Sequence, residues 1–164
     1  MSHSTTHPRE AAALPRAGMH ALRARWNSAA ALLDRVVTHD LLALACRLGI
    51  AAIFFYSGRT KVSGVLMLTD SAIDLFRNEY KVPLLPPELA AHMAAYAEHL
   101  FPLLLVLGLC TRLSALALLG MTLVIQLFIY PDAWPTHLSW AAILLYLAGR
   151  GAGVLSLDRA LGIR

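Results

Sequence analysis

Four long apolar runs determine the kind of fold that this chain can adopt. They cover residues 41–58, 89–109, 113–130 and 133–149, and each is close to the roughly 17–25 residues that a helix needs to cross a bilayer. Hydrophobic residues make up 58% of the 164 residues and charged residues 15%, whereas soluble domains are about 45–50% apolar and about 25% charged. A disordered chain, a disulfide scaffold and a soluble enzyme all fit poorly. We therefore expect an all-α protein, a four-helix transmembrane bundle.

The segment before the first run is basic and divides into two parts. Residues 1–18 lack apolar periodicity and are expected to form a flexible tail, not a signal peptide, because they contain no apolar h-region. In residues 19–37, apolar side chains recur at helical spacing, with arginines beside and opposite them. This pattern predicts a basic amphipathic helix that lies on an anionic membrane surface; a solvated extension of the first span is the alternative. Residues 38–164 then form the membrane domain.

The distribution of basic residues predicts the orientation of the spans. Of the 14 Lys and Arg residues, nine lie before the first span, after the second or after the fourth; four lie in the first loop, and one lies within a span. The positive-inside rule therefore predicts that both termini are cytoplasmic, in a bacterial-type inner (plasma) membrane. Because the basic residues border apolar segments, the net charge of +4 does not indicate a nucleic-acid partner.

The first outer loop, residues 59–88, contains its own helical pattern. The stretch TDSAIDLFRNEY predicts a short helix across the outer mouth of the bundle, with Thr69 or Asp70 as its N-cap. The prolines that follow exclude regular helix until Pro87, which is expected near the first position of the second span.

Two charged residues, Arg47 and Glu98, interrupt the apolar runs. A central arginine costs about 2.5–3.5 kcal/mol on insertion scales, so it should pair or face a cavity. At 1.5 Å per residue, Arg47 lies about 16 Å and Glu98 about 13–14 Å from the outer end. We therefore expect an intramembrane Arg47–Glu98 pair near the midplane. Its role is either structural or catalytic, as a pair that polarises a ligand or passes a proton.

Polar and aromatic residues gather near the outer ends of the spans. One stripe of the first span contains Arg47, Phe54, Gly58 and Lys61. At 100° per residue, the last three positions lie within about 40° of Arg47 around the helix axis. Lys61 lies at the outer mouth, either in a site or as a snorkelling anchor. A mostly apolar pocket with a few polar groups suits a lipid-soluble ring such as a quinone. The candidate pocket residues are Tyr56, Ser57, Lys61, His92, Gln126, Tyr130 and His137.

The histidines and cysteines do not indicate a metal site. His92 and His99 lie seven residues apart, which separates them by roughly 10 Å along a helix, too far to bind one metal ion together. Cys46 and Cys110 have no CxxC spacing and are interpreted as packing residues. An axial haem ligand is less well supported for the histidines than a hydrogen bond inside the bundle. Quinone is the one cofactor that the pattern suggests.

Several segments, in a characteristic order, carry a resemblance to a known family. They are RLGIAAIFFYSGRTKVSG, LFRNEYKVPLLPPELAAHMAAYAEHLFPLLLVLGLCTRLSALAL, YPDAWPTHLSWAAILLYL and RGAGVLSLDRALG, within about residues 42–161. The chain resembles the DoxX family of small four-helix membrane proteins. That family takes its name from a subunit of a thiosulfate:quinone oxidoreductase, and other members are associated with thiol or oxidative-stress systems or with metal-handling genes. The resemblance implies membrane-bound redox work with quinone as electron acceptor.

Three hypotheses of function remain open at this point. The first is the membrane subunit of a redox system that interacts with quinone or with a thiol- or sulfur-oxidising partner; if active, it is a quinone-linked oxidoreductase subunit. The second is a noncatalytic membrane scaffold or anchor, linked to oxidative stress or metal handling. A small-solute carrier is the weakest, because inverted repeats are not evident. The expected partners are the lipid bilayer and either another protein or a second copy of the chain.

Overall fold

The structure, a computed structural model, describes residues 14–163 and divides the chain into two units at Thr38. Residues 1–13, most of the expected tail, lie outside the described residues. Unit 1 contains helix α1 (Leu14–Val36). This helix begins before Met19, so residues 14–18 are helical, which corrects the prediction that the tail extends to residue 18. The apolar stripe of α1, which includes Leu22, Trp26 and Leu33, is exposed.

Unit 2 contains the long helices of the expected membrane domain. They are α2 (His39–Arg59), α4 (Pro87–Leu107), α5 (Thr111–Val124) and α6 (Trp134–Arg150). A π-helical turn, η2 (Ile125–Ile129), continues α5, and a 3-10 turn, η3 (Pro131–Ala133), leads into α6. Among the described residues, three helices are long and apolar enough to cross a membrane: α2, α4 and the continuous α5–η2. Helix α6, with 17 residues, is shorter.

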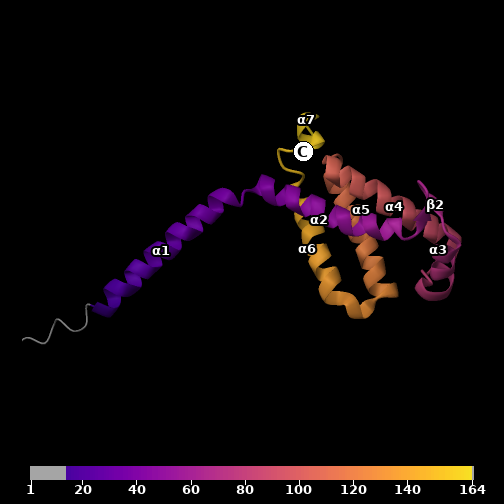
Figure 1. The fold of residues 1–164 in the computed structure, drawn as a ribbon, viewed down its shortest axis with the longest axis horizontal. Coiled ribbons are helices and arrows are strands. Elements are labelled where there is room, and N and C mark those ends of the chain that lie inside the picture. Colours follow the sequence, from indigo (N-terminus) through magenta and orange to yellow (C-terminus); the bar gives the residue numbers. More distant parts are fainter. Residues whose placement is uncertain (1–13, 164) are drawn as a thin grey trace, which may run out of the picture. The chain divides into compact units, whose positions relative to one another are not determined.

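The long helices of unit 2 pack as two pairs around a shared core. Helix α2 lies beside α4, and α5 lies beside α6 (Figure 1). The core includes Ile50 from α2, Leu105 from α4, Leu118 from α5 and Leu144 from α6, each fully buried. Since every long helix contributes to this cluster, the four helices depend on one another for burial of their apolar faces.

The two ends of unit 2 differ, and we name each by its buried basic residue. At the Arg47 end, α2 and α5 begin, α4 and α6 end, and the short helix α7 (Leu157–Ala160) packs nearby. At the Lys61 end, α2 ends and α4 begins. Figure 1 shows the two helix pairs meeting near α7 and separating away from it. A cavity lined by side chains of both pairs lies at the Lys61 end.

The first loop folds into a small cap at the Lys61 end (Figure 1). Strands β1 (Val62–Ser63) and β2 (Met67–Leu68) form an antiparallel hairpin that the sequence pattern did not predict. Helix α3 (Asp70–Leu75) then begins with Thr69 as its N-cap, whose hydroxyl accepts a hydrogen bond from the Ala72 N–H. A π-helical turn, η1 (Phe76–Tyr80), completes the predicted loop helix. The predicted N-cap is therefore confirmed, as is Pro87 as the first residue of α4.

Candidate functional site

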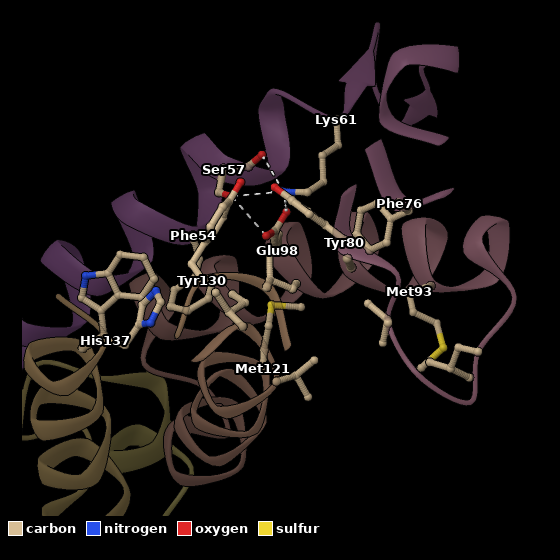
Figure 2. A pocket seen from close by; sticks show the side chains of 18 of the residues that line it. Phe54, Ser57, Lys61, Phe76, Tyr80, Met93, Glu98, Met121, Tyr130 and His137 are labelled. Carbon is tan, nitrogen blue, oxygen red and sulfur yellow. Dashed lines mark hydrogen bonds and ion pairs between the residues drawn. The ribbon is translucent and has the colours of Figure 1, made fainter. Parts of the chain in front are cut away.

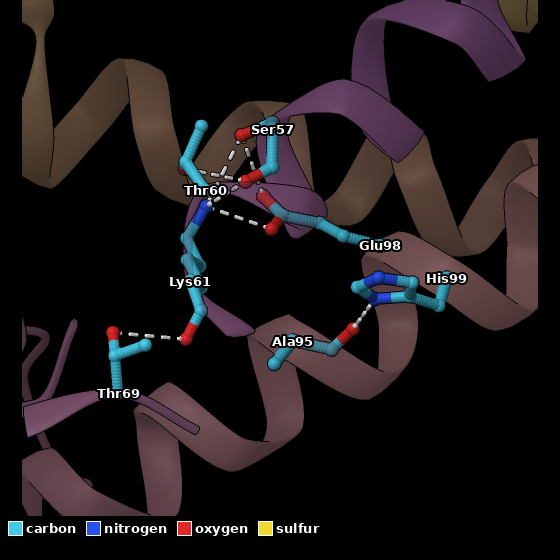
Figure 3. A network of polar contacts seen from close by, with 7 residues as sticks. All are labelled: Ser57, Thr60, Lys61, Thr69, Ala95, Glu98 and His99. Atoms are coloured by element: carbon cyan, nitrogen blue, oxygen red, sulfur yellow. Dashed lines mark hydrogen bonds and ion pairs between the residues drawn. The ribbon is translucent and has the colours of Figure 1, made fainter. Parts of the chain in front are cut away.

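A buried ion pair lies at the Lys61 end. Lys61 Nζ is 2.7 Å from Glu98 Oε2, and the two residues are only 5% and 3% exposed. Lys61 Nζ also donates to the carbonyl and hydroxyl oxygens of Ser57, at 3.2 and 3.1 Å, and the Ser57 hydroxyl donates to Glu98 Oε1 at 3.1 Å (Figure 3). We call these three residues the Lys61 network. Both buried charges are thus paired and hydrogen-bonded, the condition under which burial of charge is tolerated.

The local structure explains how α2 and α4 bring these side chains together. A Cβ atom at Gly58 would lie 2.9 Å from both Glu98 Cβ and His99 Cε1, so glycine is required for the close approach of the two helices. The main chain of Lys61 is held from the other side, because its carbonyl accepts from the N–H of Thr69 at 3.0 Å and from the Thr69 hydroxyl at 3.3 Å (Figure 3). The N-cap of α3 therefore also fixes the position of Lys61.

An apolar cavity of about 290 Å³ opens beside the Lys61 network. Aromatic and aliphatic side chains from α2, α4, α5, α6 and η1 form most of its wall (Figure 2). The polar groups that face it are few. Ser57, Lys61, Glu98, Tyr80, Tyr130 and His137 provide them.

Two tyrosines direct their hydroxyl groups toward the ion pair (Figure 2). The rings of Tyr80 and Tyr130 meet edge to face, with centroids 5.9 Å apart. Burial, together with a hydrogen bond to Tyr130 and the nearby Glu98 carboxylate, raises the pKa of Tyr80 above its ordinary value. The Tyr80 hydroxyl therefore stays protonated at neutral pH and can donate a hydrogen bond.

The predicted pocket residues separate into those that line the cavity and those that do not. Ser57, Lys61, Tyr130 and His137 line it. Tyr56 is 72% exposed, because it is next to Ser57 and points about 100° away around α2. His92 is exposed on α4 and bonds the Glu88 carbonyl in its own helix. Tyr56 and His92 therefore do not belong to this cavity.

Gln126 does not line the cavity but contacts His137, which does. Its amide oxygen lies 2.7 Å from His137 Nδ1, and its amide nitrogen donates to the Pro131 carbonyl at 2.7 Å. His137 itself is buried and packs against Trp140, with ring centroids 5.2 Å apart. Gln126 thus fixes the orientation of the His137 ring from outside the cavity.

The predicted Arg47–Glu98 pair is wrong, because the two side chains point toward opposite ends of unit 2. Arg47 Nε donates to the Leu105 carbonyl at 2.7 Å, and Nη2 donates to the Val106 carbonyl at 2.9 Å. Side chains in a helix lean toward that helix's own N-terminus. Since α2 and α4 are antiparallel, this lean moves the head of Arg47 away from that of Glu98, an effect that a depth estimate from backbone rise omits.

The C-terminal segment completes the surroundings of Arg47. Arg47 Nη1 donates to the carbonyls of Ala152 and Leu155, each at 2.8 Å. The Asp158 carboxylate accepts from the N–H groups of Cys110 and Thr111, at 2.7 and 2.9 Å, and so caps the start of α5. We call Arg47, its carbonyl acceptors and Asp158 the Arg47 network.

Other residues important to the site could not be assigned from the sequence. Tyr80 and Phe76 reach the cavity from the loop helix, which was predicted to lie across the outer mouth of the bundle but was not assigned any residue of the site. The sequence did indicate which face of α2 is directed inward, because all four residues of the predicted stripe, Arg47, Phe54, Gly58 and Lys61, are buried. No group of three or more His, Cys, Asp or Glu residues that could hold a metal ion occurs within residues 14–163.

Comparison with known proteins assigns the family. The model of the DoxX family matches residues 42–131, more than half of the chain. The chain belongs to the DoxX family. A protein of Haemophilus influenzae described as uncharacterised is 32% identical to it over 125 residues, which cover 70% of this chain and 80% of that protein. No solved structure matches the chain. The DoxX match includes Lys61 and Glu98, whereas His137 and Asp158 lie beyond it.

Proposed function

We propose that this DoxX-family membrane protein is the membrane subunit of a redox system and that the cavity at the Lys61 end binds a quinone head group. One observation carries the proposal: a buried Lys61–Glu98 pair and two tyrosine hydroxyls face an otherwise apolar cavity. Pockets for lipid-soluble rings combine apolar walls with a few polar groups in this way.

The composition of the cavity fits the chemistry of a quinone. A quinone ring needs apolar contacts on its faces, which Phe54, Met121 and Trp140 supply, and hydrogen-bond donors for its carbonyls. The Lys61 ammonium and the Tyr80 hydroxyl are such donors. The volume of about 290 Å³ lies just below the roughly 300–1,000 Å³ usual for drug-sized ligands, so the cavity suits a head group without its long tail.

The residues of the Lys61 network have distinct expected roles in such a site. Reduction of a quinone at this site would require two electrons from a partner protein and two protons from the surrounding water. Lys61 and Tyr80 would orient the carbonyl groups, while Glu98 would hold the Lys61 side chain in position through the 2.7 Å contact. Ser57 bridges the two charges and keeps both side chains in place. The enzyme activity proposed is that of the redox system, with this chain as its quinone-binding subunit.

We also propose the membrane arrangement that the site requires. Helix α6 is the fourth span: its 17 residues extend about 25 Å at 1.5 Å per residue, and its Leu144 and Leu147 are fully buried in the common core. The excess of basic residues at the Arg47 end and in α1 supports cytoplasmic termini in an inner (plasma) membrane. The cavity then lies toward the outer face.

The experiment measures quinone binding by the fluorescence of Trp140, which lines the cavity. Replacing the other two tryptophans, Trp26→Phe and Trp134→Phe, leaves Trp140 as the reporter in the full-length chain. Titration with menadione should quench it saturably, with N-acetyltryptophanamide as the control for light absorption by the quinone. Glu98→Gln should raise the Kd about tenfold or more, because Lys61 loses the partner that positions it and its charge-assisted contact with the quinone, worth about 1.5–3 kcal/mol, weakens.

The matched control is His92→Gln, a polar substitution on the exposed side of the same helix. It should leave the Kd unchanged. Linear quenching without saturation, or the same Kd in Glu98→Gln as in the parent, would show that the cavity is not a quinone site.

A noncatalytic anchor is the second candidate function, and α1 is the observation that favours it. The exposed apolar stripe of Leu22, Trp26 and Leu33, bordered by arginines, suits a membrane surface, a partner protein or a second copy of the chain. Replacing Leu22 and Trp26 together by Ser should abolish capture of the partner or reduce oligomer mass in native mass spectrometry. Unchanged capture and mass would show that the stripe binds neither a partner protein nor a second copy of the chain.

A further inference from the structure

A second hollow, of about 550 Å³, lies at the Arg47 end and takes no part in the proposed quinone site. The beginnings of α2 and α5, the end of α6 and the C-terminal segment surround it. Three arginines line it, namely Arg112, Arg150 and Arg159, together with the carboxylates Asp40 and Asp158. The arrangement brings together basic residues that are far apart in the sequence.

Both carboxylates of the hollow accept hydrogen bonds from main-chain N–H groups. Both oxygens of Asp158 accept N–H groups at the start of α5, and Asp40 Oδ1 accepts the Val154 N–H at 2.9 Å. Within the part of the chain that the structure describes, the ion pairs involve Lys61 and Arg77 and none of the arginines of the hollow. The positive charge of the three arginines is therefore not neutralised by an ion pair there.

Arg112 is held in a fixed orientation. Its Nη1 donates to the carbonyls of Ala148 and Gly149, at 2.6 and 2.8 Å, where α6 ends. Its Nη2 and Nε face Gly151, where a Cβ atom would lie 3.7 and 3.8 Å away. Gly151 has a φ of +81°, a conformation that favours glycine, so no side chain at this position covers that edge of the exposed Arg112 guanidinium. A guanidinium fixed on one edge is well suited to bind an oxyanion in bidentate fashion with the other.

We propose that this hollow binds a phosphate group, with Arg112 as the oriented contact and Arg150 and Arg159 as flanking charges. The phosphate could belong to the head group of an anionic phospholipid or to a soluble phosphate compound. The lipid is favoured because Leu113 and Ile163, both exposed apolar residues, line the same hollow and would contact an acyl chain. The proposal is independent of the quinone site.

The test uses the full-length chain in detergent and three probes: phosphatidylglycerol, phosphatidylcholine and inorganic phosphate. Binding is measured as retained adducts in native mass spectrometry and as a shift in Tm. We expect phosphatidylglycerol to bind more tightly than phosphatidylcholine. Arg150→Gln/Arg159→Gln should weaken its binding about tenfold or more, since each basic residue near a membrane surface contributes about 1 kcal/mol, or about fivefold.

The control is Arg77→Gln, which removes an exposed arginine from the first loop without changing the hollow. Arg112→Lys is a second variant. It keeps the positive charge but removes the paired N–H donors of the guanidinium, so it should also weaken binding. Competition by inorganic phosphate at low concentration would assign the site to a soluble phosphate compound. Equal binding of the two lipids without phosphate binding, or equal losses in Arg77→Gln and the double variant, would overturn the proposal.

Discussion

Two buried basic residues, Arg47 within α2 and Lys61 just after its last turn, are satisfied by different chemistry. Arg47 donates to four main-chain carbonyls, two from the last turn of α4 and two from the C-terminal segment. Lys61 instead pairs with the Glu98 carboxylate beside an apolar cavity. The first arrangement satisfies groups that every helix end leaves unpaired. The second keeps two reactive side chains next to a space that a ligand could occupy.

This difference separates a structural role from a functional one. A cation at a helix C-terminus and a carboxylate at a helix N-terminus both complement the helix dipole, as Arg47 does for α4 and Asp158 for α5. A buried ion pair adds little stability compared with apolar residues of similar size. The Lys61–Glu98 pair is therefore better explained by its contact with the cavity than by stabilisation of the fold.

Arg47→Gln is expected to cause the largest loss of stability. Several buried carbonyls would lose their donor at once, so the free energy of unfolding should fall by about 3–5 kcal/mol. Reversible unfolding in mixed detergent measures the change. Arg59→Gln is the matched control, because Arg59 lies at the other end of α2, is exposed, and donates only to loop carbonyls. A loss below about 1 kcal/mol in Arg47→Gln would contradict the structural role.

The Lys61 network should respond differently to paired substitutions. Lys61→Met alone leaves Glu98 without its ionic partner and should cost about 3 kcal/mol, the lower end of the range for a broken buried pair, because Ser57 still donates to Glu98. Adding Glu98→Leu should restore stability to within about 1 kcal/mol of the parent, since an apolar pair replaces an ion pair at little cost. Quinone binding should stay lost in both variants. If the double variant is as unstable as Lys61→Met, the pair has a structural role after all.

Arg47→Gln has no compensating second substitution of this kind, because the acceptors of Arg47 are main-chain atoms. The contrast between main-chain and side-chain partners also explains which contacts could be predicted from the sequence. Apolar length predicted the three spans that the structure supports, and the period of α2 predicted the stripe of Arg47, Phe54, Gly58 and Lys61. The partners of Arg47 and Glu98 depend on the direction in which each side chain leans in antiparallel helices, and an estimate of residue depth gives no information on that direction.

The Arg47 network was also hidden because its acceptors carry no sequence signal. Any residue provides a carbonyl, so nothing in the apolar stretch around Leu105 indicated that it binds a guanidinium. Asp158 lies 47 residues from Thr111, whose N–H it accepts, a separation that local capping patterns do not cover. The cap over the Lys61 end was partly predictable, because Thr69 and the loop helix follow local capping and helix patterns. The hairpin was not predictable, because strands of two residues each are too short to show an alternating pattern.

Gly108 offers a smaller test of how tightly the Arg47 end is packed. Its φ is +66°, and a Cβ atom would lie 2.5 Å from Ser156 Cβ and 2.9 Å from the Arg47 guanidinium carbon. Gly108→Ala should therefore cost about 1–3 kcal/mol. Gly120→Ala is the control, because nothing lies within 4 Å of its added Cβ, and alanine in a helix interior is better than glycine by roughly 0.5–1 kcal/mol. Equal effects of the two substitutions would show that the Arg47 end can relax.

The smallest effect is expected from Tyr80 and appears only at high pH. Burial and the hydrogen bond to Tyr130 raise the pKa of Tyr80, so above about pH 10 the unfolded chain releases this proton while the folded chain retains it. The stabilising effect is therefore fully present below pH 10 and is lost as the pH rises toward the folded pKa, by less than about 1.4 kcal/mol per pH unit. In Tyr80→Phe, the contribution of Tyr80 to the fall in the free energy of unfolding with rising pH should be absent.

The measurements are the free energy of unfolding from pH 7 to 10.5 and phenolate absorbance at the same pH values. Parallel profiles for the parent and Tyr80→Phe would mean that Tyr80 ionises as an ordinary exposed tyrosine, and the cavity would then lack its neutral donor in alkaline solution.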